Sequence, residues 1–591
     1  MKNHSKIDPV TLRVLGGAFD TIAKEMALHQ YRMAHCTLVT ESEDLGCGLF
    51  MPDGRQIAES GNSPLHCGSI GGYIRGVLKK LEGDIQEGDV IAHNNPYMGA
   101  SHTPDVGIII PIFHEDRLIG FAGSTSHWVD IGGSQPGINL DALDMWAEGI
   151  IFSGAKLYEA GKRNEQLWEF IWNNVRTPHE NRGDCLAQIA ACQFGKRRFL
   201  ELVRRYGYET VMAAAERWMD YAEEALRLRV KAVPPGAYFA EGWLDDDGKN
   251  RGKRLRVATK VIVSEDGGLT VDLTGSASET ETGFNCPFYG ATCVGVYAAV
   301  RSIFLDEYTL EEPVPQNEGI FRAVRVVAPL GSMFNPRFPK GTFARLTQIQ
   351  RVADNILKAL APVLPEPMRS AGTSAHIHWL SYSGFRPDTG DYWVHLEPEA
   401  GGSFGGRHGR DGSDATAVLC TNTRNVPIEH MEKMFPLRCE RYELRDEPPA
   451  AGRWRSGLGI VRVNRVLAPT IVSCEGDRHF DPPWGVLGGK QGRPGSLTKI
   501  GRGGKREPWP SKFTGWRLEA GEALEIKTPV GGGYGDPYQR DPQKVLDDVL
   551  DGYISLETAK SDYGVVINPQ TMQVDTKASE KLRKSFKFSK Q

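Results

Sequence analysis

The chain has 591 residues, enough for several domains and a large buried core, and its 40% hydrophobic and 24% charged residues are typical of a soluble globular protein. Its 70 basic and 74 acidic side chains leave a formal net charge of -4. Because the two signs are interspersed and nearly balanced, the composition argues against nucleic acid or an anionic membrane as a partner.

The N-terminal third combines a long helix, a sheet and a helical segment. Asp8 followed by proline is a helix start signal, and apolar residues then recur at helical spacing to about residue 34. Residues 37–131 alternate short apolar runs with Gly, Pro and Asp loops, which predicts a sheet with one helix near residues 71–81. Residues 184–232 have the strongest helical signal, which Gly207 divides into two helices.

The rest of the chain is richer in strands. A Val-Pro-Pro-Gly sequence at residues 233–236 marks a domain boundary. Strand-like runs follow at residues 254–273, and glycine is dense from 371 to 535, where a second β-rich region is expected. A last helical segment is predicted at residues 542–562. The basic tail, residues 577–591, is interpreted as a frayed end.

The predicted fold class is therefore α+β (mixed α/β), with several domains, β-rich sheets, flanking helices and a short helical C-terminal segment. We expect an α/β domain at 1–235, a mixed α/β domain at 236–370 and a Gly-rich, β-rich domain at 371–540. The C-terminal helical segment and basic tail occupy 541–591.

The compartment predicted from the sequence is the cytoplasm. The first residues contain no apolar core of a signal peptide, and no run approaches the ~20 apolar residues that a membrane helix needs. The ten cysteines form no Cys-x-x-Cys pair, so we expect reduced and mostly buried thiols.

The sharpest local feature is the loop at residues 94–105, which ends in His102-Thr-Pro-Asp105. Proline disfavours a helix at the preceding residue, so His102 and Asp105 are expected on a turn that leads into a strand. A second strand would fold back and end at His127, beside the start of the first. Two imidazoles and a carboxylate suit zinc, manganese or iron.

Glu41 and Asp44 belong to an acidic cluster that precedes a predicted strand and offers a fourth ligand. The alternative interpretation is structural: the two histidines would bond to backbone, and the acidic cluster would be a solvated turn. His66 lies in a Gly/Pro-containing stretch, predicted as a loop, from which it could reach the same pocket. The candidates for a direct part in catalysis are His66, Asp105 and His127.

The sequence contains no nucleotide-binding loop. Residues 485–491 contain Gly-Gly-Lys, but no Ser or Thr follows the lysine and the glycine spacing does not match the P-loop pattern. If the reaction uses ATP, we expect a partner chain to bind it.

Several motifs resemble those of the hydantoinase B/oxoprolinase family. They are Glu-Asp-Leu-Gly-Cys-Gly at 43–48, Leu-His-Cys-Gly-Ser-Ile at 65–70, Asn-Pro-Tyr-Met-Gly at 95–99 with His-Thr-Pro-Asp at 102–105, His-Trp-Val-Asp at 127–130, and Gly-Gly-Gly-Tyr-Gly-Asp-Pro at 531–537. The resemblance runs from about residue 8 to residue 566. The family includes B-type subunits of N-methylhydantoinase and caprolactamase, 5-oxoprolinase, and the related large subunits of acetone and acetophenone carboxylases.

The resemblance implies a metal site and a division of labour between subunits. It implies that His102, Asp105 and His127 are metal ligands, joined by Asp44 as in the lactam-opening branch or by Glu41 as in the carboxylase branch. It also implies a hydantoinase A-type sister subunit that binds ATP. Because such enzymes form symmetric assemblies, we expect at least a dimer of heterodimers.

The expected reaction is the ATP-dependent hydrolysis of a cyclic amide. The alternatives are a subunit of a ketone carboxylase, in which the pocket would hold bicarbonate or an enolate, a metal-dependent hydrolase that works alone without ATP, and a structural subunit whose metal stabilises the fold. The chain is shorter than the large subunit expected for an acetone carboxylase, which favours the amide branch.

Overall fold

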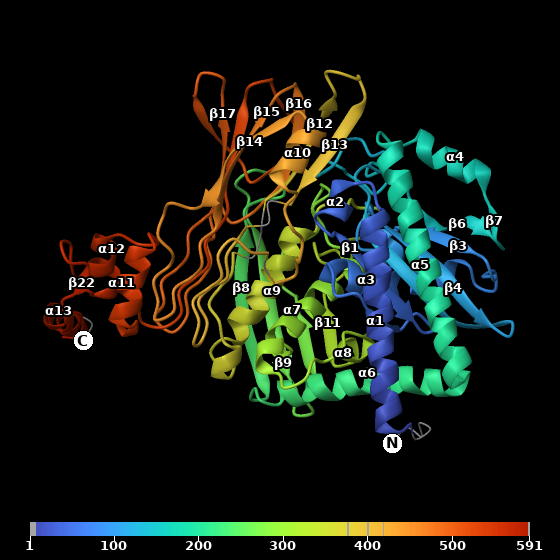
Figure 1. The fold of residues 1–591 in the computed structure, drawn as a ribbon, viewed down its shortest axis with the longest axis horizontal. Coiled ribbons are helices and arrows are strands. Elements are labelled where there is room, and N and C mark those ends of the chain that lie inside the picture. The colour runs from blue at the N-terminus through green and yellow to red at the C-terminus, as the bar shows by residue number, and fades with distance from the viewer. Residues whose placement is uncertain (1–6, 375–377, 399–400, 418, 589–591) are drawn as a thin grey trace.

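The computed structural model describes residues 7–374, 378–398, 401–417 and 419–588. Their helices and mostly antiparallel sheets confirm the predicted mixed α and β class (Figure 1). Among these residues, no helix is both long and apolar enough to cross a membrane. All ten cysteines are free thiols, and all except the partly exposed Cys439 are buried.

The N-terminal part is built on a seven-stranded antiparallel sheet. Its strand order is β2 (Gln56–Glu59), β1 (Leu45–Phe50), β5 (Arg117–His127), β4 (Asp105–His114), β3 (Val90–His93), β6 (Ser153–Glu159) and β7 (Lys162–Arg163). The helices of this part are α1 (Pro9–Met33), α2 (Thr37–Thr40), α3 (Pro64–Lys80), α4 (Glu165–Asn173), α5 (Pro178–Tyr206) and α6 (Tyr208–Val230).

Helices cover both faces of this sheet. Helices α1 and α5 pack on one face and enclose a large apolar core, while α3 packs on the other and encloses a smaller one. Helix α1 begins as predicted, because the Asp8 side chain accepts a hydrogen bond from the Thr11 amide and proline occupies the first turn. Gly207 separates α5 from α6 with a positive φ of 83°.

The predicted helix at 71–81 starts earlier than expected. Ser63 takes the N-cap position and Pro64 begins α3, so His66 lies in the first helical turn and the prediction of a loop there is wrong. The Ser-Pro pair was the missed signal, since proline is favoured at the first helical position.

The middle part contains a four-stranded sheet against which helices pack. Its order is β11 (Val324–Val327), β10 (Leu269–Asp272), β9 (Leu255–Val263) and β8 (Gly236–Leu244). The helices here are α7 (Val294–Phe304), α8 (Glu318–Arg322) and α9 (Leu346–Leu360). Helix α9 contacts β8, β9 and α7, and α7 also contacts α3. The apolar core of this part includes residues of the first part, among them Leu38 and Leu65.

The glycine-rich region contains two further sheets. The first has the order β13 (Tyr392–Glu397), β12 (Trp379–Phe385), β16 (Thr470–Glu475) and β19 (Lys512–Leu518). The second has the order β14 (Leu437–Leu444), β15 (Ile460–Val466), β20 (Ala523–Lys527), β17 (Ser496–Ile500) and β18 (Arg506–Trp509), with α10 (Ile428–Met434) beside β14. A shared apolar core joins the two sheets, so the expected β-rich region is present.

A small helical unit ends the chain and projects from the body (Figure 1). It contains α11 (Pro542–Leu550), α12 (Leu556–Tyr563), a two-stranded ribbon of β21 (Ile567–Asn568) and β22 (Gln573–Val574), and α13 (Thr576–Phe588). The prediction of a frayed basic tail is wrong as far as residue 588. Arg583 holds α13 in place by donating hydrogen bonds to the carbonyl oxygens of Tyr563 and Arg540.

Buried ion pairs attach this unit to the β-rich region. Arg540 pairs with Asp411 at 2.6 Å and with Asp548 at 2.8 Å, and its side chain is only 2% exposed. Arg455 also pairs with Asp548, at 2.8 Å. Breaking a buried pair leaves a charge without compensation, which is costly.

We therefore expect Arg540→Met to weaken the attachment of residues 541–588 by about 3 kcal/mol. Protease susceptibility of this segment, measured in increasing urea, reports the change. Arg517→Met is the matched control, because the Arg517–Glu519 pair is 66% and 49% exposed and should contribute less than about 0.5 kcal/mol. Equal susceptibility of the two variants would contradict the assignment.

Candidate functional site

The β4–β5 hairpin brings Asp105 and His127 together. Its two-residue turn is Glu115-Asp116, and both residues have positive φ, of 50° and 57°, as such turns require. Ile119 is an extra residue in β5, so the pairing shifts by one between Phe113↔Leu118 and Ile112↔Gly120. As a result Asp105 pairs directly with His127, and their side chains share one face of the sheet.

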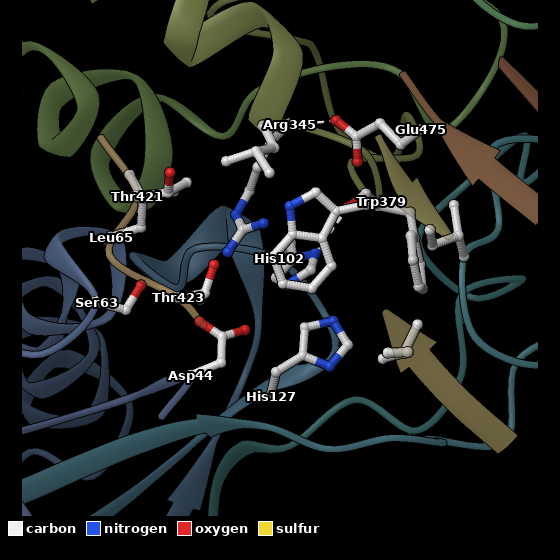
Figure 2. Close-up of a pocket in the computed structure, with 14 residues that line it drawn as sticks. Asp44, Ser63, Leu65, His102, His127, Arg345, Trp379, Thr421, Thr423 and Glu475 are labelled. Atoms are coloured by element: carbon white, nitrogen blue, oxygen red, sulfur yellow. Dashed lines mark hydrogen bonds between the residues drawn. The ribbon is translucent and has the colours of Figure 1, made fainter. Parts of the chain in front are cut away.

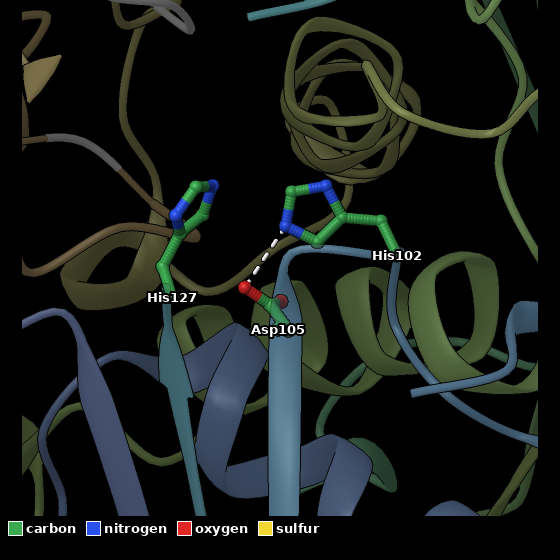
Figure 3. A group of neighbouring side chains, drawn as sticks. All are labelled: His102, Asp105 and His127. Carbon is green, nitrogen blue, oxygen red and sulfur yellow. Dashed lines mark hydrogen bonds and ion pairs between the residues drawn. The ribbon is translucent and has the colours of Figure 1, made fainter. Parts of the chain in front are cut away.

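His102 completes a compact group with these two residues. Its Nε2 lies 2.9 Å from Asp105 Oδ1, and its ring centre lies 5.1 Å from that of His127 (Figure 3). All three side chains are buried, and one potential ligand atom from each lies within 4.8 Å of the others. In the described chain this is the one group of at least three His, Cys, Asp or Glu residues with such spacing.

The hydrogen bonds of His102 define its tautomer. Nδ1 lies 2.7 Å from the Phe343 carbonyl oxygen, which can only accept, so Nδ1 carries the proton. Burial, together with the positive charge of Arg345, lowers the pKa of His102 and favours the neutral ring. Nε2 of a neutral ring would then direct a lone pair at the Asp105 carboxylate.

Two facing lone pairs repel unless a cation lies between them. A backbone carbonyl that orients the far nitrogen of a histidine is also the usual outer-shell arrangement around a bound metal. His127 adds a second buried imidazole: burial, then the nearby His102, lower its pKa to about 3, and its Nδ1 has no hydrogen-bond partner among the described residues. Two neutral imidazoles and a carboxylate therefore fit a divalent cation of the zinc or manganese type.

The two acidic candidates for a further ligand occupy different environments. Asp44 is buried and lines the same pocket as His102 and His127. Glu41 instead lies 3.0 Å from His430 Nδ1, is 31% exposed and does not line this pocket. The geometry therefore favours Asp44 over Glu41.

His66 contacts the Asp105 carboxylate of the group and the neighbouring Asp44 carboxylate. Its Nε2 is 3.2 Å from Asp44 Oδ1 and 3.6 Å from Asp105 Oδ1, while its Nδ1 is 3.1 Å from the Thr125 hydroxyl. Burial alone would lower the pKa of His66, but the carboxylates of Asp105 and Asp44 outweigh it and raise the pKa. His66 therefore supports the two carboxylates, and it is not among the residues that line the pocket.

Sequence reasoning missed a residue of the site that is distant in the chain. Arg345, just before α9, lies with Nη2 2.5 Å from Asp105 Oδ2 and Nε 2.7 Å from the Ser101 hydroxyl. Burial would raise the pKa of Asp105, but His102, His66 and Arg345 together hold it well below its usual range. No local pattern could have indicated Arg345, because the contact joins residues 240 positions apart.

The group opens onto a pocket with two kinds of wall (Figure 2). The apolar wall consists of Leu65, Ile138, Phe343, Leu346, Trp379 and Leu396. The polar lining consists of Asp44, Ser63, His102, His127, Arg345, Thr421, Thr423 and Glu475. These residues come from all three larger parts of the fold, so the pocket exists only when the parts are packed together.

Comparison with known proteins gives extensive matches. The chain is 42% identical to the putative B-type subunit of a D-/L-hydantoinase from Pseudomonas sp. (strain NS671), over 98% of each chain. It is 30% identical to the beta subunit of the caprolactamase of Pseudomonas jessenii, over 95% of this chain and 97% of the other. It is also 28% identical to 5-oxoprolinase 1 of Arabidopsis thaliana, where the match covers 89% of this chain but 42% of the longer relative.

Solved structures share the fold. The ATP-dependent caprolactamase of Pseudomonas jessenii matches with a TM-score of 0.88 and 28% identity, over 98% of this chain and 100% of the other. A nucleotide-free acetone carboxylase matches with a TM-score of 0.89 over 99% of this chain and 83% of the other, and at 19% identity it shows the fold alone. Since the profile of the Hydantoinase B/oxoprolinase family matches residues 8–537, the chain belongs to that family.

Proposed function

We propose that this chain is the metal-binding subunit of an ATP-dependent enzyme that hydrolyses a cyclic amide. The group formed by His102, Asp105 and His127 at the base of a half-apolar pocket is the observation that carries the proposal. The identity to subunits of a hydantoinase and of a caprolactamase favours the amide branch over a ketone carboxylase. The partner is a hydantoinase A-type subunit that binds ATP.

A cyclic amide is hard to hydrolyse because resonance stabilises its carbonyl and its nitrogen leaves poorly. Phosphorylation of the carbonyl oxygen by ATP in the partner removes the resonance and creates a better electrophile. In the overall reaction the ring C–N bond breaks, the carbonyl carbon gains an oxygen from water, and the nitrogen gains a proton. A second water is consumed as ATP is converted into ADP and phosphate.

The residues of this chain supply the second half of that reaction. His102, Asp105 and His127 hold the metal, with Asp44 as the fourth ligand and His66 as the group that fixes both carboxylates. A bound divalent cation would lower the pKa of a coordinated water to about 7. Trp379, Ile138 and Leu396 take the hydrocarbon part of the ring and limit the access of bulk water.

Metal content tests the site directly. The purified chain should contain about one zinc, manganese or iron atom, and His102→Ala or His127→Ala should remove most of it and lower activity roughly 100-fold or more. His114→Ala is the control, since His114 lies at the far end of the same hairpin and its side chain is 32% exposed. Elemental analysis giving wild-type metal content in both site variants would reject the ligand assignment.

The division of labour gives a second prediction. The chain alone should neither bind ATP nor open a cyclic amide, because it has no P-loop motif. Addition of the sister subunit and ATP should produce the ring-opened acid and one ADP per ring. Calorimetry that gives a micromolar ATP constant for the chain alone would overturn this, and incorporation of labelled bicarbonate into a ketone would favour the carboxylase instead.

Assembly gives a third prediction. An activated amide formed in one subunit and hydrolysed in another must be protected from water during transfer. We therefore expect a permanent interface above about 2,000 Å² with the sister subunit, within a dimer of heterodimers. Light scattering of the co-expressed subunits measures the mass. A fully active monomer of this chain would contradict both the assembly and the coupled mechanism.

A further inference from the structure

Arg345 has one guanidinium nitrogen that makes no hydrogen bond within the described part of the chain. A guanidinium carries five N–H donors. Nε donates to Ser101 and Nη2 to Asp105, but Nη1 has no hydrogen bond to any described residue. The residue is 7% exposed and lines the pocket, and Figure 2 shows its guanidinium directed into it. A buried cationic donor is therefore available to a ligand.

Thr423 offers a second unused group in the same pocket. Its hydroxyl oxygen is buried and has no hydrogen-bond partner among the described residues, although the residue is only 5% exposed. The hydroxyl also points into the pocket, on the side where Arg345 and Asp44 lie (Figure 2). Burying polar groups without partners destabilises a fold, so a ligand that satisfies both groups gains binding energy from them.

The carboxylates around this position are already engaged by donors of the protein. Asp105 faces Arg345 and His102, and Asp44 faces His66. Glu475 Oε1 accepts hydrogen bonds from the amides of Leu346 and Thr347 at the start of α9. Among the donors left for a ligand are two that lie on the same side of the pocket, Arg345 Nη1 and the Thr423 hydroxyl. Two donors match an oxygen that carries negative charge.

We propose that Arg345 and Thr423 form an oxyanion subsite beside the metal group, which binds a carboxylate or phosphate oxygen of the ligand. The inference rests on the proposed function, because cyclic-amide opening generates a carboxylate next to the metal, and phosphate is released from the activated amide. The guanidinium of Arg345 thus has two roles: Nη2 orients Asp105, and Nη1 binds the ligand.

Anion binding to the full chain, purified with its metal and without ATP, tests the subsite. Acetate and inorganic phosphate are titrated separately by calorimetry, so that the two sources of oxyanion are distinguished. We expect the wild-type chain to bind at least one of them. Arg345→Lys and Thr423→Val should each weaken that binding roughly tenfold or more, since each removes a donor to a charged oxygen.

Three controls keep the result interpretable. Thr423→Ser retains the hydroxyl and should restore binding. Thr416→Val makes the same change in the same segment, but the Thr416 hydroxyl bonds to the Ala417 carbonyl, so binding should not change. Metal content is measured in every variant. If Arg345→Lys loses metal because Asp105 is no longer held in place, the anion affinity of Thr423→Val alone decides the test.

The outcomes separate this inference from the proposed function. Absence of acetate and phosphate binding at millimolar concentration, or wild-type affinity in Thr423→Val, overturns the subsite even if the complex opens cyclic amides. Weakened anion binding in Arg345→Lys and Thr423→Val supports the subsite. If the complete complex then fails to open any cyclic amide, the proposed function is rejected while the subsite stands.

Discussion

One extra residue, Ile119, sets the register of the hairpin formed by β4 and β5. Side chains alternate between the faces of a strand, so an unshifted register would place Ser126 opposite Asp105 and turn His127 to the other face. The turn at Glu115-Asp116 sets the residue pairing at one end of the hairpin. The bulge shifts that pairing by one residue at the other end, where Asp105 pairs with His127. The spacing of His102, Asp105 and His127 therefore depends on backbone geometry rather than on flexible side chains.

A second constraint joins this hairpin to a distant part of the chain. Buried Glu148 accepts hydrogen bonds from the Thr103 hydroxyl and from the Thr342 amide, so it ties the loop that contains His102 to the loop that contains Arg345. Burial raises the pKa of Glu148 to about 8. Because Phe343 orients His102 and Arg345 orients Asp105, the metal group and its surroundings depend on packing between the first and middle parts of the fold.

The sequence could predict the features of this site that depend on neighbouring residues, but not those that depend on residues far apart in the chain. The hairpin, the start of α1 and the division at Gly207 are local patterns, and all were predictable. The β-bulge at Ile119 was not predictable, since no residue type in an apolar strand marks the position of an extra residue. Ser63-Pro64 is a local helix-start signal, and it puts His66 in the first turn of α3 rather than in the predicted loop. Arg345 and Thr423 reach the pocket through tertiary packing alone, which no local pattern contains.

The charge states of the buried carboxylates and histidines depend on one another. Asp44 and Asp105 both have lowered pKa values, because nearby histidines, and Arg345 for Asp105, outweigh the effect of burial, which alone would raise them. His102 and His127 are shifted towards the neutral form, so the positive charge beside the two carboxylates comes from Arg345 and from His66, whose pKa is raised. In the proposed function, a divalent cation bound where the donor atoms converge would add further positive charge. This positive charge would attract an anionic oxygen to the donors of Arg345 and Thr423. In the proposed function, binding of the metal therefore prepares the pocket for its ligand.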